Sequence, residues 1–308
     1  MTVSNYSGLT ARWTSTDRAH LRHSHHHDLL LPCPPGTTMH ILTVGYLEAD
    51  LAFMIRGANT STFTTRSDPF INARRLMPMY CVLISHPHEG LILWETGGGK
   101  NFPTDVGPAI ADVFTRVKYE PEHELAAAIA KTGHDIGEVK KVVLGHLHID
   151  HAGGLEDFVG REGVEVWVHD KELRVAFWSV ATGADDQVYM GHCLRLDMNW
   201  RTFDEERFEL CQGITLHHLP GHTEGLCAMQ VNLQDSGSSL FTSDMYHVIE
   251  NLRDDKPQGW LQRDHVQWFR SHRKVRNLQR TQRCRVIPGH DDGTILEMHK
   301  EKPDNVWT

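Results

Sequence analysis

The stretch VVLGHLHIDHAGG, residues 142–154, constrains the fold and chemistry of this chain more than any other. An apolar run ends at Gly145, and three histidines and one aspartate follow within the six positions 146–151. The run is typical of a buried strand, so these polar side chains are expected on a short loop at its end. Neutral imidazoles and a carboxylate are ligands that zinc and similar divalent ions prefer. The stretch therefore predicts a metal site at the edge of a sheet.

The spacing inside this motif favours two neighbouring ions. His146 and His148 alternate and share a face, whereas Asp150 and His151 lie one turn further along, which suits a second ion. The glycines that follow, 153 and 154, would let another backbone segment pack closely behind the loop.

Three further candidate ligands each follow an apolar run that would deliver them to the same sheet edge. They are His222 in HLPGHTEG, Asp244 in LFTSD and His290 in RVIPGHD. Each is weak evidence for a metal site when taken alone; a histidine after a glycine, for example, is more often an ordinary loop residue. Together with the first motif they predict a centre for two divalent metal ions, most simply zinc.

Apolar runs of strand character recur along the whole chain. They lie at 39–55, 79–84, 90–97, 141–146, 164–170, 213–219, 227–233, 239–244 and 284–290. Helical patterns fall at 121–133 and 264–280, the second with apolar Val266, Phe269, Val275 and Leu278 and a basic far face. Early strands, late strands and intervening helices predict an α/β fold of two sheets with helices outside.

The domain organisation is expected to be simple. The chain has 308 residues, 40% of them hydrophobic, and no repeat or long linker divides it. We expect a flexible N-terminal arm over 1–35 and a single domain over 36–308. The tract HSHHHD at 23–28 lies in the arm and is interpreted as disordered, since adjacent histidines without a framework bind metal only loosely.

Composition narrows the partners and the compartment. A formal net charge of −9 repels phosphate backbones, so we expect no nucleic-acid partner, and a nuclease is disfavoured. No apolar stretch reaches the roughly 18 residues that a membrane span needs, so no membrane partner is expected. The six cysteines are scattered without a CxxC pair, which is typical of reduced thiols in a cytoplasmic protein.

The order of the motifs resembles the metallo-β-lactamase superfamily. HLHIDH, PGHTEG, the aspartate that ends a strand and PGH follow one another over roughly residues 79–292. The detail is most similar to N-acyl homoserine lactonases, which show a strand like YCVLI and a motif like GHLHIDHAGG. They also share an aspartate followed by a Glu-Asn pair, here Asp244 with Glu250 and Asn251.

This resemblance implies a four-layer αββα sandwich with metals at the sheet edges. It implies that one metal is held by His146, His148 and His222, the second by Asp150, His151 and His290, and that Asp244 bridges both. A small-molecule lactone or ester is the implied substrate, and the implied activity is that of a quorum-quenching lactonase. A homodimer is compatible with the sequence.

Two positions depart from the family pattern. Glu95 stands in ETG where the family usually has aspartate, and this longer carboxylate can still support the metal loop. The lactonases place a tyrosine three residues after the bridging aspartate, where this chain has His247 and, one residue earlier, Tyr246. We expect His247 to hydrogen-bond the substrate carbonyl, with Tyr246 as the alternative.

The ligand set itself indicates hydrolysis. Seven protein ligands for two ions leave positions for water and substrate, which is typical of catalytic rather than structural sites. Such ions lower the pKa of a bound water from 15.7 towards about 7 and so supply hydroxide. Asp150 is expected to pass a proton to the leaving group.

Two other activities remain open on this sequence. They are a glyoxalase II-like thioesterase and a mononuclear iron dioxygenase of the same fold, which metal analysis would separate from a hydrolase with two ions. The basic run 270–280 is interpreted as a solvated helix face rather than a thioester-binding patch. Apolar residues in 45–57, 69–80 and 176–183 either line a site for an acyl group or belong to the core.

Overall fold

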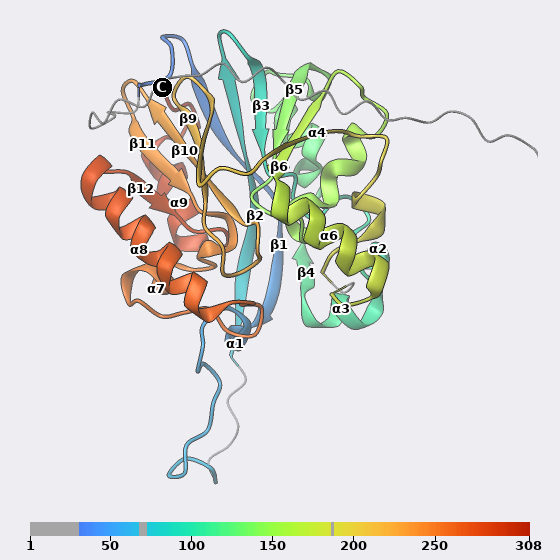
Figure 1. Ribbon diagram of the computed structural model, residues 1–308, viewed down its shortest axis with the longest axis vertical. Coiled ribbons are helices and arrows are strands. Elements are labelled where there is room, and N and C mark those ends of the chain that lie inside the picture. The colour runs from blue at the N-terminus through green and yellow to red at the C-terminus, as the bar shows by residue number, and fades with distance from the viewer. Residues whose placement is uncertain (1–30, 68–72, 186–187) are drawn as a thin grey trace, which may run out of the picture.

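The computed structural model describes residues 31–67, 73–185 and 188–308. Two β-sheets lie face to face in the middle of the molecule, and helices cover their outer faces (Figure 1). This is the four-layer α/β architecture that the sequence predicts, and the fold class is confirmed.

The first sheet has seven strands in the order β4-β1-β2-β3-β5-β6-β7. Their bounds are β1 Thr38–Asp50, β2 Arg74–His86, β3 Gly90–Trp94, β4 Thr115–Lys118, β5 Val139–Val143, β6 Glu165–His169 and β7 Asn199–Phe203. Strands β3, β5, β6 and β7 are parallel, so their carboxyl ends meet at one edge. The HLHIDH motif directly follows β5 at that edge.

The second sheet has five strands in the order β12-β11-β10-β9-β8. Their bounds are β8 Arg207–Cys211, β9 Ile214–His218, β10 Cys227–Leu233, β11 Gly237–Phe241 and β12 Arg285–Ile287. Strand β10 is antiparallel to both β9 and β11, and β11 is parallel to β12. Strands β9, β11 and β12 therefore run in the same direction and bring their following loops to one edge.

Helices flank the two sheets (Figure 1). The α-helices are α1 Leu51–Met54, α2 Phe102–Asp105, α3 Gly107–Val113, α4 Leu125–Ala130, α5 Ile149–Ala152, α6 Asp170–Thr182, α7 Ile249–Arg253, α8 His265–Gln282 and α9 Asp292–Glu301. The 3₁₀ turns are η1 Pro121–His123, η2 Ile136–Glu138, η3 Gly153–Phe158, η4 Gly191–Cys193 and η5 Ser243–Met245. Helices α4 and α6 pack on the first sheet, and α7 and α8 on the second.

Burial on both faces of the sheet explains why the sequence of β2 contains a continuous apolar run. Tyr80, Val82 and Ile84 point between the sheets, whereas Cys81 and Leu83 point towards the helices on the outer face. Because successive side chains of a strand alternate between faces, a central strand covered on both sides is apolar throughout.

Several local predictions need correction. The run 39–55 is not one strand, because Asp50 caps the short helix α1 by accepting a hydrogen bond from the Ala52 amide. The segment 121–133 is not one helix, since Glu124 is extended between η1 and α4.

Helix α8 confirms the pattern at 264–280 but buries a different face. Its buried residues are Trp268, Ser271, His272 and Val275, whereas Val266 is 60% exposed. The basic run 270–280 is largely at the surface, as expected for a solvated face.

The N-terminal arm and the single domain stay predictions. Most of the expected arm, with the tract 23–28, lies outside the described residues. Cys33, which the prediction placed in the arm, is fully buried and its amide donates to the Asn232 carbonyl at 2.7 Å, so the packed body begins before residue 36. Among the described residues, no helix combines the length and the apolar character needed to cross a membrane.

Candidate metal centre

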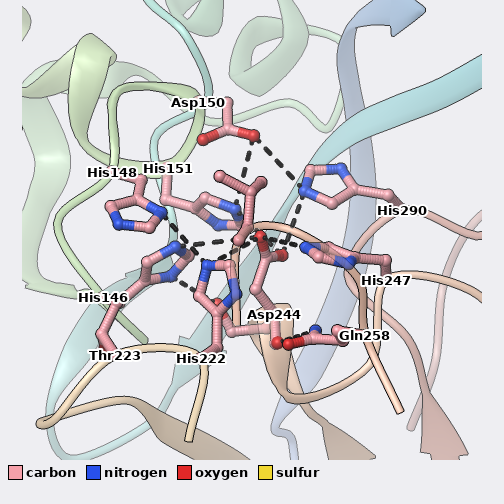
Figure 2. A network of polar contacts seen from close by, with 12 residues as sticks. His146, His148, Asp150, His151, His222, Thr223, Asp244, His247, Gln258 and His290 are labelled. Atoms are coloured by element: carbon pink, nitrogen blue, oxygen red, sulfur yellow. Dashed lines mark hydrogen bonds and ion pairs between the residues drawn. The ribbon is translucent and has the colours of Figure 1, made fainter. Parts of the chain in front are cut away.

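The predicted ligands converge at the edge where the strands of both sheets end. His146 and His148 follow β5, Asp150 and His151 lie on α5, and His222 lies between β9 and β10. Asp244 lies in η5 after β11, and His290 precedes α9 after β12. Figure 2 shows the imidazole rings and the two carboxylates pointing towards a common centre.

Three histidines form a first group, here called the triad: His146, His148 and His222. One ligand atom of each lies within 4.8 Å of the others, and all three side chains are buried. His222 Nε2 lies 3.1 Å from His148 Nδ1. Three imidazoles at this separation are the donor set of many zinc sites.

Asp150, His151, His290 and Asp244 form a second group, again with ligand atoms within 4.8 Å of one another. His290 Nε2 lies 3.4 Å from Asp150 Oδ2, and His151 Nε2 lies 3.8 Å from the same oxygen. This group provides nitrogen and oxygen atoms for a second ion.

Asp244 lies between the two groups. Its Oδ1 is 3.0 Å from His290 Nε2 and 3.2 Å from His151 Nε2. Its Oδ2 is 3.4 Å from His222 Nε2 and 3.9 Å from His146 Nε2. One carboxylate oxygen thus faces each group, which is the placement that a bridging ligand requires.

Hydrogen bonds behind the rings fix their orientation. His290 Nδ1 donates to the Pro78 carbonyl at 3.0 Å, which leaves Nε2 for the centre. Ser243 Oγ donates to Glu95 Oε1 at 2.8 Å and can therefore accept from His146 Nδ1 at 3.1 Å. Glu95 Oε1 also lies 3.3 Å from His151 Nδ1, so the longer carboxylate reaches the metal loop.

The glycines after the histidine motif are required by close packing. A Cβ on Gly153 would lie 2.3 Å from the Gly98 carbonyl oxygen, and one on Gly154 would lie 2.3 Å from the Thr96 carbonyl oxygen. Because such distances are not tolerated between non-bonded atoms, only glycine allows the loops after β3 and α5 to pack together. The close approach expected from the sequence is present.

Burial controls the protonation of the triad. Burial lowers the pKa of His146, His148 and His222 well below the usual value, and the neighbouring imidazoles lower it further. The three rings are therefore neutral at physiological pH and have a free lone pair for a metal ion.

Asp244 has the opposite effect on the second group. Burial lowers the pKa of His151, but the carboxylates of Asp244, Glu95 and Asp150 raise it well above the usual value. Burial raises the pKa of Asp244, yet His290, His151 and His247 lower it well below its usual range. Asp244 is therefore ionised and available as an anionic ligand.

The buried polar atoms of the site fit divalent metal ions. Among the described residues, six buried polar atoms of these ligands form no hydrogen bond: His146 Nε2, His148 Nε2, His151 Nε2, His222 Nδ1, His290 Nε2 and Asp244 Oδ1. Burying unpaired polar atoms is costly, so a cluster of them indicates partners of another kind. Metal ions at the centre would pair those of these atoms that lie around Asp244, namely His146 Nε2, His151 Nε2 and His290 Nε2.

The two candidates for the substrate carbonyl are placed differently. His247 is completely buried, and its Nε2 lies 3.1 Å from Asp244 Oδ2. Tyr246 packs against Trp268, and its hydroxyl lies 2.8 Å from His272 Nδ1. The structure brings His247 to the cluster and does not bring the Tyr246 hydroxyl there.

A pocket opens beside the centre. His148, Asp150 and Asp244 line it together with apolar side chains that include Leu47, Met77, Phe102 and Phe114. Two of the three segments proposed from the sequence, 45–57 and 69–80, thus contribute to the pocket, whereas 176–183 falls largely within α6.

Comparisons with known proteins identify the class. The family model described as the metallo-beta-lactamase superfamily matches residues 75–290. The chain belongs to this superfamily, and it is a metal-dependent hydrolase.

The similar relatives are more specific. N-acyl homoserine lactonase AiiB of Agrobacterium fabrum is 27% identical over 266 residues, which cover 83% of this chain and 94% of that protein. N-acyl homoserine lactonase AiiA of Bacillus thuringiensis subsp. kurstaki is 24% identical over 224 residues, 70% of this chain and 82% of that protein. The resemblance to N-acyl homoserine lactonases predicted from the motifs is confirmed.

Solved structures show the same fold. An N-acyl homoserine lactone hydrolase with the product N-hexanoyl-L-homoserine at its catalytic metal centre superposes with a TM-score of 0.69 at 20% identity, covering 84% of this chain and 95% of that chain. AidC, a dizinc quorum-quenching lactonase, gives a TM-score of 0.62 at 18% identity, covering 85% and 89%.

Proposed function

We propose that this protein is a lactonase with two divalent metal ions, most simply zinc, that opens the ring of N-acyl homoserine lactones. The observation that carries the proposal is the position of Asp244, with one oxygen facing the triad and the other facing His151 and His290. The similarity to named lactonases over most of the chain supports the substrate class.

In this proposal the triad holds one ion, Asp150, His151 and His290 hold the other, and Asp244 binds both. When bound, such ions lower the pKa of a water molecule and polarise the carbonyl of an ester. Asp150 is 16% exposed at its side chain and lines the pocket, so it can meet both solvent and substrate. We assign to it the transfer of a proton to the leaving alkoxide.

His247 is our candidate for the hydrogen bond to the substrate carbonyl. Its Nε2 lies 3.1 Å from Oδ2 of Asp244, and Asp244 lines the pocket. Tyr246 is the weaker candidate because its hydroxyl already has a hydrogen-bond partner in His272 Nδ1. The side chain lies in a cluster of apolar side chains around Trp268.

The residues that line the pocket match an apolar acyl group in their chemistry. Leu47 and Met77 from the first sheet and Phe102 and Phe114 from the helical layer face the same space as Asp150. Binding sites of this kind combine apolar walls with a few polar groups that orient the ligand. A fatty amide beside the lactone ring fits that pattern.

The rival activities are less consistent with the geometry. A mononuclear iron dioxygenase needs one ion, whereas a second group of four candidate ligands is complete here. Arg270 and Lys274 of the basic run on α8 line a separate pocket, whose lining shares no residue with the pocket beside Asp150. The homodimer and the cytoplasmic location remain predictions.

An activity panel tests the proposal. The metal-loaded protein is assayed with N-acyl homoserine lactones of several chain lengths, simple lactones, aryl esters and glutathione thioesters, and its metals are measured by elemental analysis. We expect the highest kcat/KM for acyl homoserine lactones and about two ions per chain. Preference for glutathione thioesters, or a single iron, would establish one of the rivals.

Removing the metals should lower the thermal stability. The centre buries many unpaired nitrogen and oxygen atoms, so the folded state binds the ions far better than the unfolded chain does. A ligand at about 1,000 times its Kd stabilises by roughly 4 kcal/mol, which corresponds to a Tm shift on the order of 10 °C here. Differential scanning calorimetry before and after dialysis against a chelator measures the shift, and re-addition of Zn²⁺ should reverse it. An unchanged Tm would contradict a buried metal centre.

A further inference from the structure

A buried glutamate lies directly behind the triad. Glu172 belongs to the first turn of α6, and none of its surface is exposed to solvent. Nothing in the sequence motifs singles it out, since it is twenty-one residues beyond His151 and fifty before His222. Its carboxylate nevertheless lies between the two loops that carry the triad.

Four hydrogen-bond donors surround this carboxylate. Oε1 accepts from the Leu147 amide at 3.0 Å and from the Tyr189 hydroxyl at 3.0 Å. Oε2 accepts from the Thr223 hydroxyl at 2.6 Å and from the Gly225 amide at 3.2 Å. An ionised carboxylate offers about four acceptor sites, so Glu172 is fully paired.

The partners of Glu172 flank the triad. Leu147 lies between His146 and His148, and Thr223 directly follows His222. The ring of Tyr189, whose hydroxyl reaches Glu172, packs edge-on against His148 with ring centroids 4.9 Å apart. One side chain thus connects the two loops whose relative position sets the distance between the three imidazoles.

The second group is held by other residues. His290 is oriented by the Pro78 carbonyl, and His151 lies beside Glu95. The four hydrogen bonds of Glu172 described above all go to residues 147, 189, 223 and 225, and none goes to α5, which carries His151, or to the loop that carries His290.

The chemistry of the site requires a carboxylate. Two of the four donors are backbone amides, which cannot reverse their direction. A glutamine at this position has one oxygen and one NH₂ group, so its NH₂ would face an amide N–H of either Leu147 or Gly225. The backbone at Gly225 is also constrained to glycine, because a Cβ on Gly225 would lie 2.2 Å from the Glu172 amide nitrogen.

We propose that Glu172 is a positioning residue that fixes the triad, and so sets the affinity of one metal ion without affecting the other. This inference rests on the ligand assignment of the proposed function. Groups that orient metal ligands typically contribute 10–100-fold to metal affinity, which makes the effect measurable.

The experiment is a competition titration of Zn²⁺ against a chromophoric chelator, with the full-length protein and its Glu172→Gln variant. We expect the wild type to bind about two ions, and Glu172→Gln to bind one of them 10–100-fold more weakly. Thr223→Val removes a single donor and should weaken the same ion to a smaller extent, which provides a test if Glu172→Gln folds poorly.

Variants in which one of the two ligand groups is already disrupted identify which ion is affected by Glu172→Gln. In His290→Ala, whose second group is broken, adding Glu172→Gln should weaken the remaining ion 10–100-fold. In His148→Ala, whose triad is broken, adding Glu172→Gln should change the affinity for the remaining ion by no more than about twofold. Ile129→Ala, a fully buried position in α4, controls for a general loss of stability and should leave both affinities unchanged.

The outcomes separate the two proposals. A wild type that binds fewer than two ions would overturn the proposed function. A wild type with two ions and a folded Glu172→Gln variant of equal affinity for both would overturn the role of Glu172 alone. An equal loss of affinity for both ions, or the same loss of affinity in Ile129→Ala, would show that Glu172 is merely structural.

Discussion

Replacing His148 by alanine is expected to abolish turnover and to lower the bound metal from about two ions per chain towards about one. The His148 side chain is buried, and its Nε2 forms no hydrogen bond in the described part of the chain. The variant leaves His146, His222 and the shared Asp244 for this ion, one protein ligand fewer than in the wild type, so the ion is held less tightly. Elemental analysis of the purified protein and a lactonase assay measure the two effects.

Asp244→Asn should also abolish turnover, but with a smaller loss of metal. The amide keeps the shape of the side chain and removes the negative charge that faces both groups. Burial raises the pKa of Asp244, yet the surrounding histidines lower it far more, so the wild-type group is ionised and the change in charge is real. We therefore expect weakened binding of both ions rather than the loss of one.

His217→Ala is the matched control for these two variants. His217 is a buried histidine in β9 whose Nε2 lies 2.9 Å from Gln230 Oε1, away from the centre. It should keep both ions and most of the activity per folded molecule. Retention of two ions and normal turnover in His148→Ala would exclude this residue as a ligand.

The candidate centre could be predicted from the sequence because its residues have a local signature. Each ligand lies in the segment that follows a strand, and strands that run in the same direction deliver such segments to one sheet edge. The residues that support the ligands have no comparable signature. Glu172 and Ser243 act through partners far away in the chain, Leu147 and Glu95 among them, and only the folded structure shows these pairs.

The three strands that were not predicted from the sequence all lie at the edges of the sheets. β4, β7 and β8 are edge strands, and most of their residues are partly or fully exposed. Their sequences TRVK, NWRTF and RFELC therefore lack the apolar run that made the central strands recognisable. The buried face of α8 differs from the predicted one for a related reason, since Ser271 and His272 are polar residues whose hydrogen-bond partners, Pro220, Tyr246 and Asp255, lie in other segments.

His247→Ala is expected to reduce kcat by about 10²–10³, or roughly 2.7–4 kcal/mol, while both metal ions stay bound. This is the loss typical of removing one donor to a developing negative charge on the substrate oxygen. His247 belongs to neither the triad nor the second group, but its Nε2 lies 3.1 Å from Oδ2 of Asp244, which lines the pocket. Steady-state kinetics at saturating substrate, combined with metal analysis of the same sample, measure the effect.

Tyr246→Phe is the matched control, because it removes only a hydroxyl whose partner is His272 and should leave kcat nearly unchanged. The metal content decides between the possible roles of His247, which has ligand atoms within 4.8 Å of those of His222 and Asp244. If His247→Ala loses an ion as His148→Ala does, His247 is a ligand and not a donor to the substrate. If kcat per metal-loaded molecule is unchanged and only Tm falls, the side chain merely packs beneath Asp244 and has no part in the reaction.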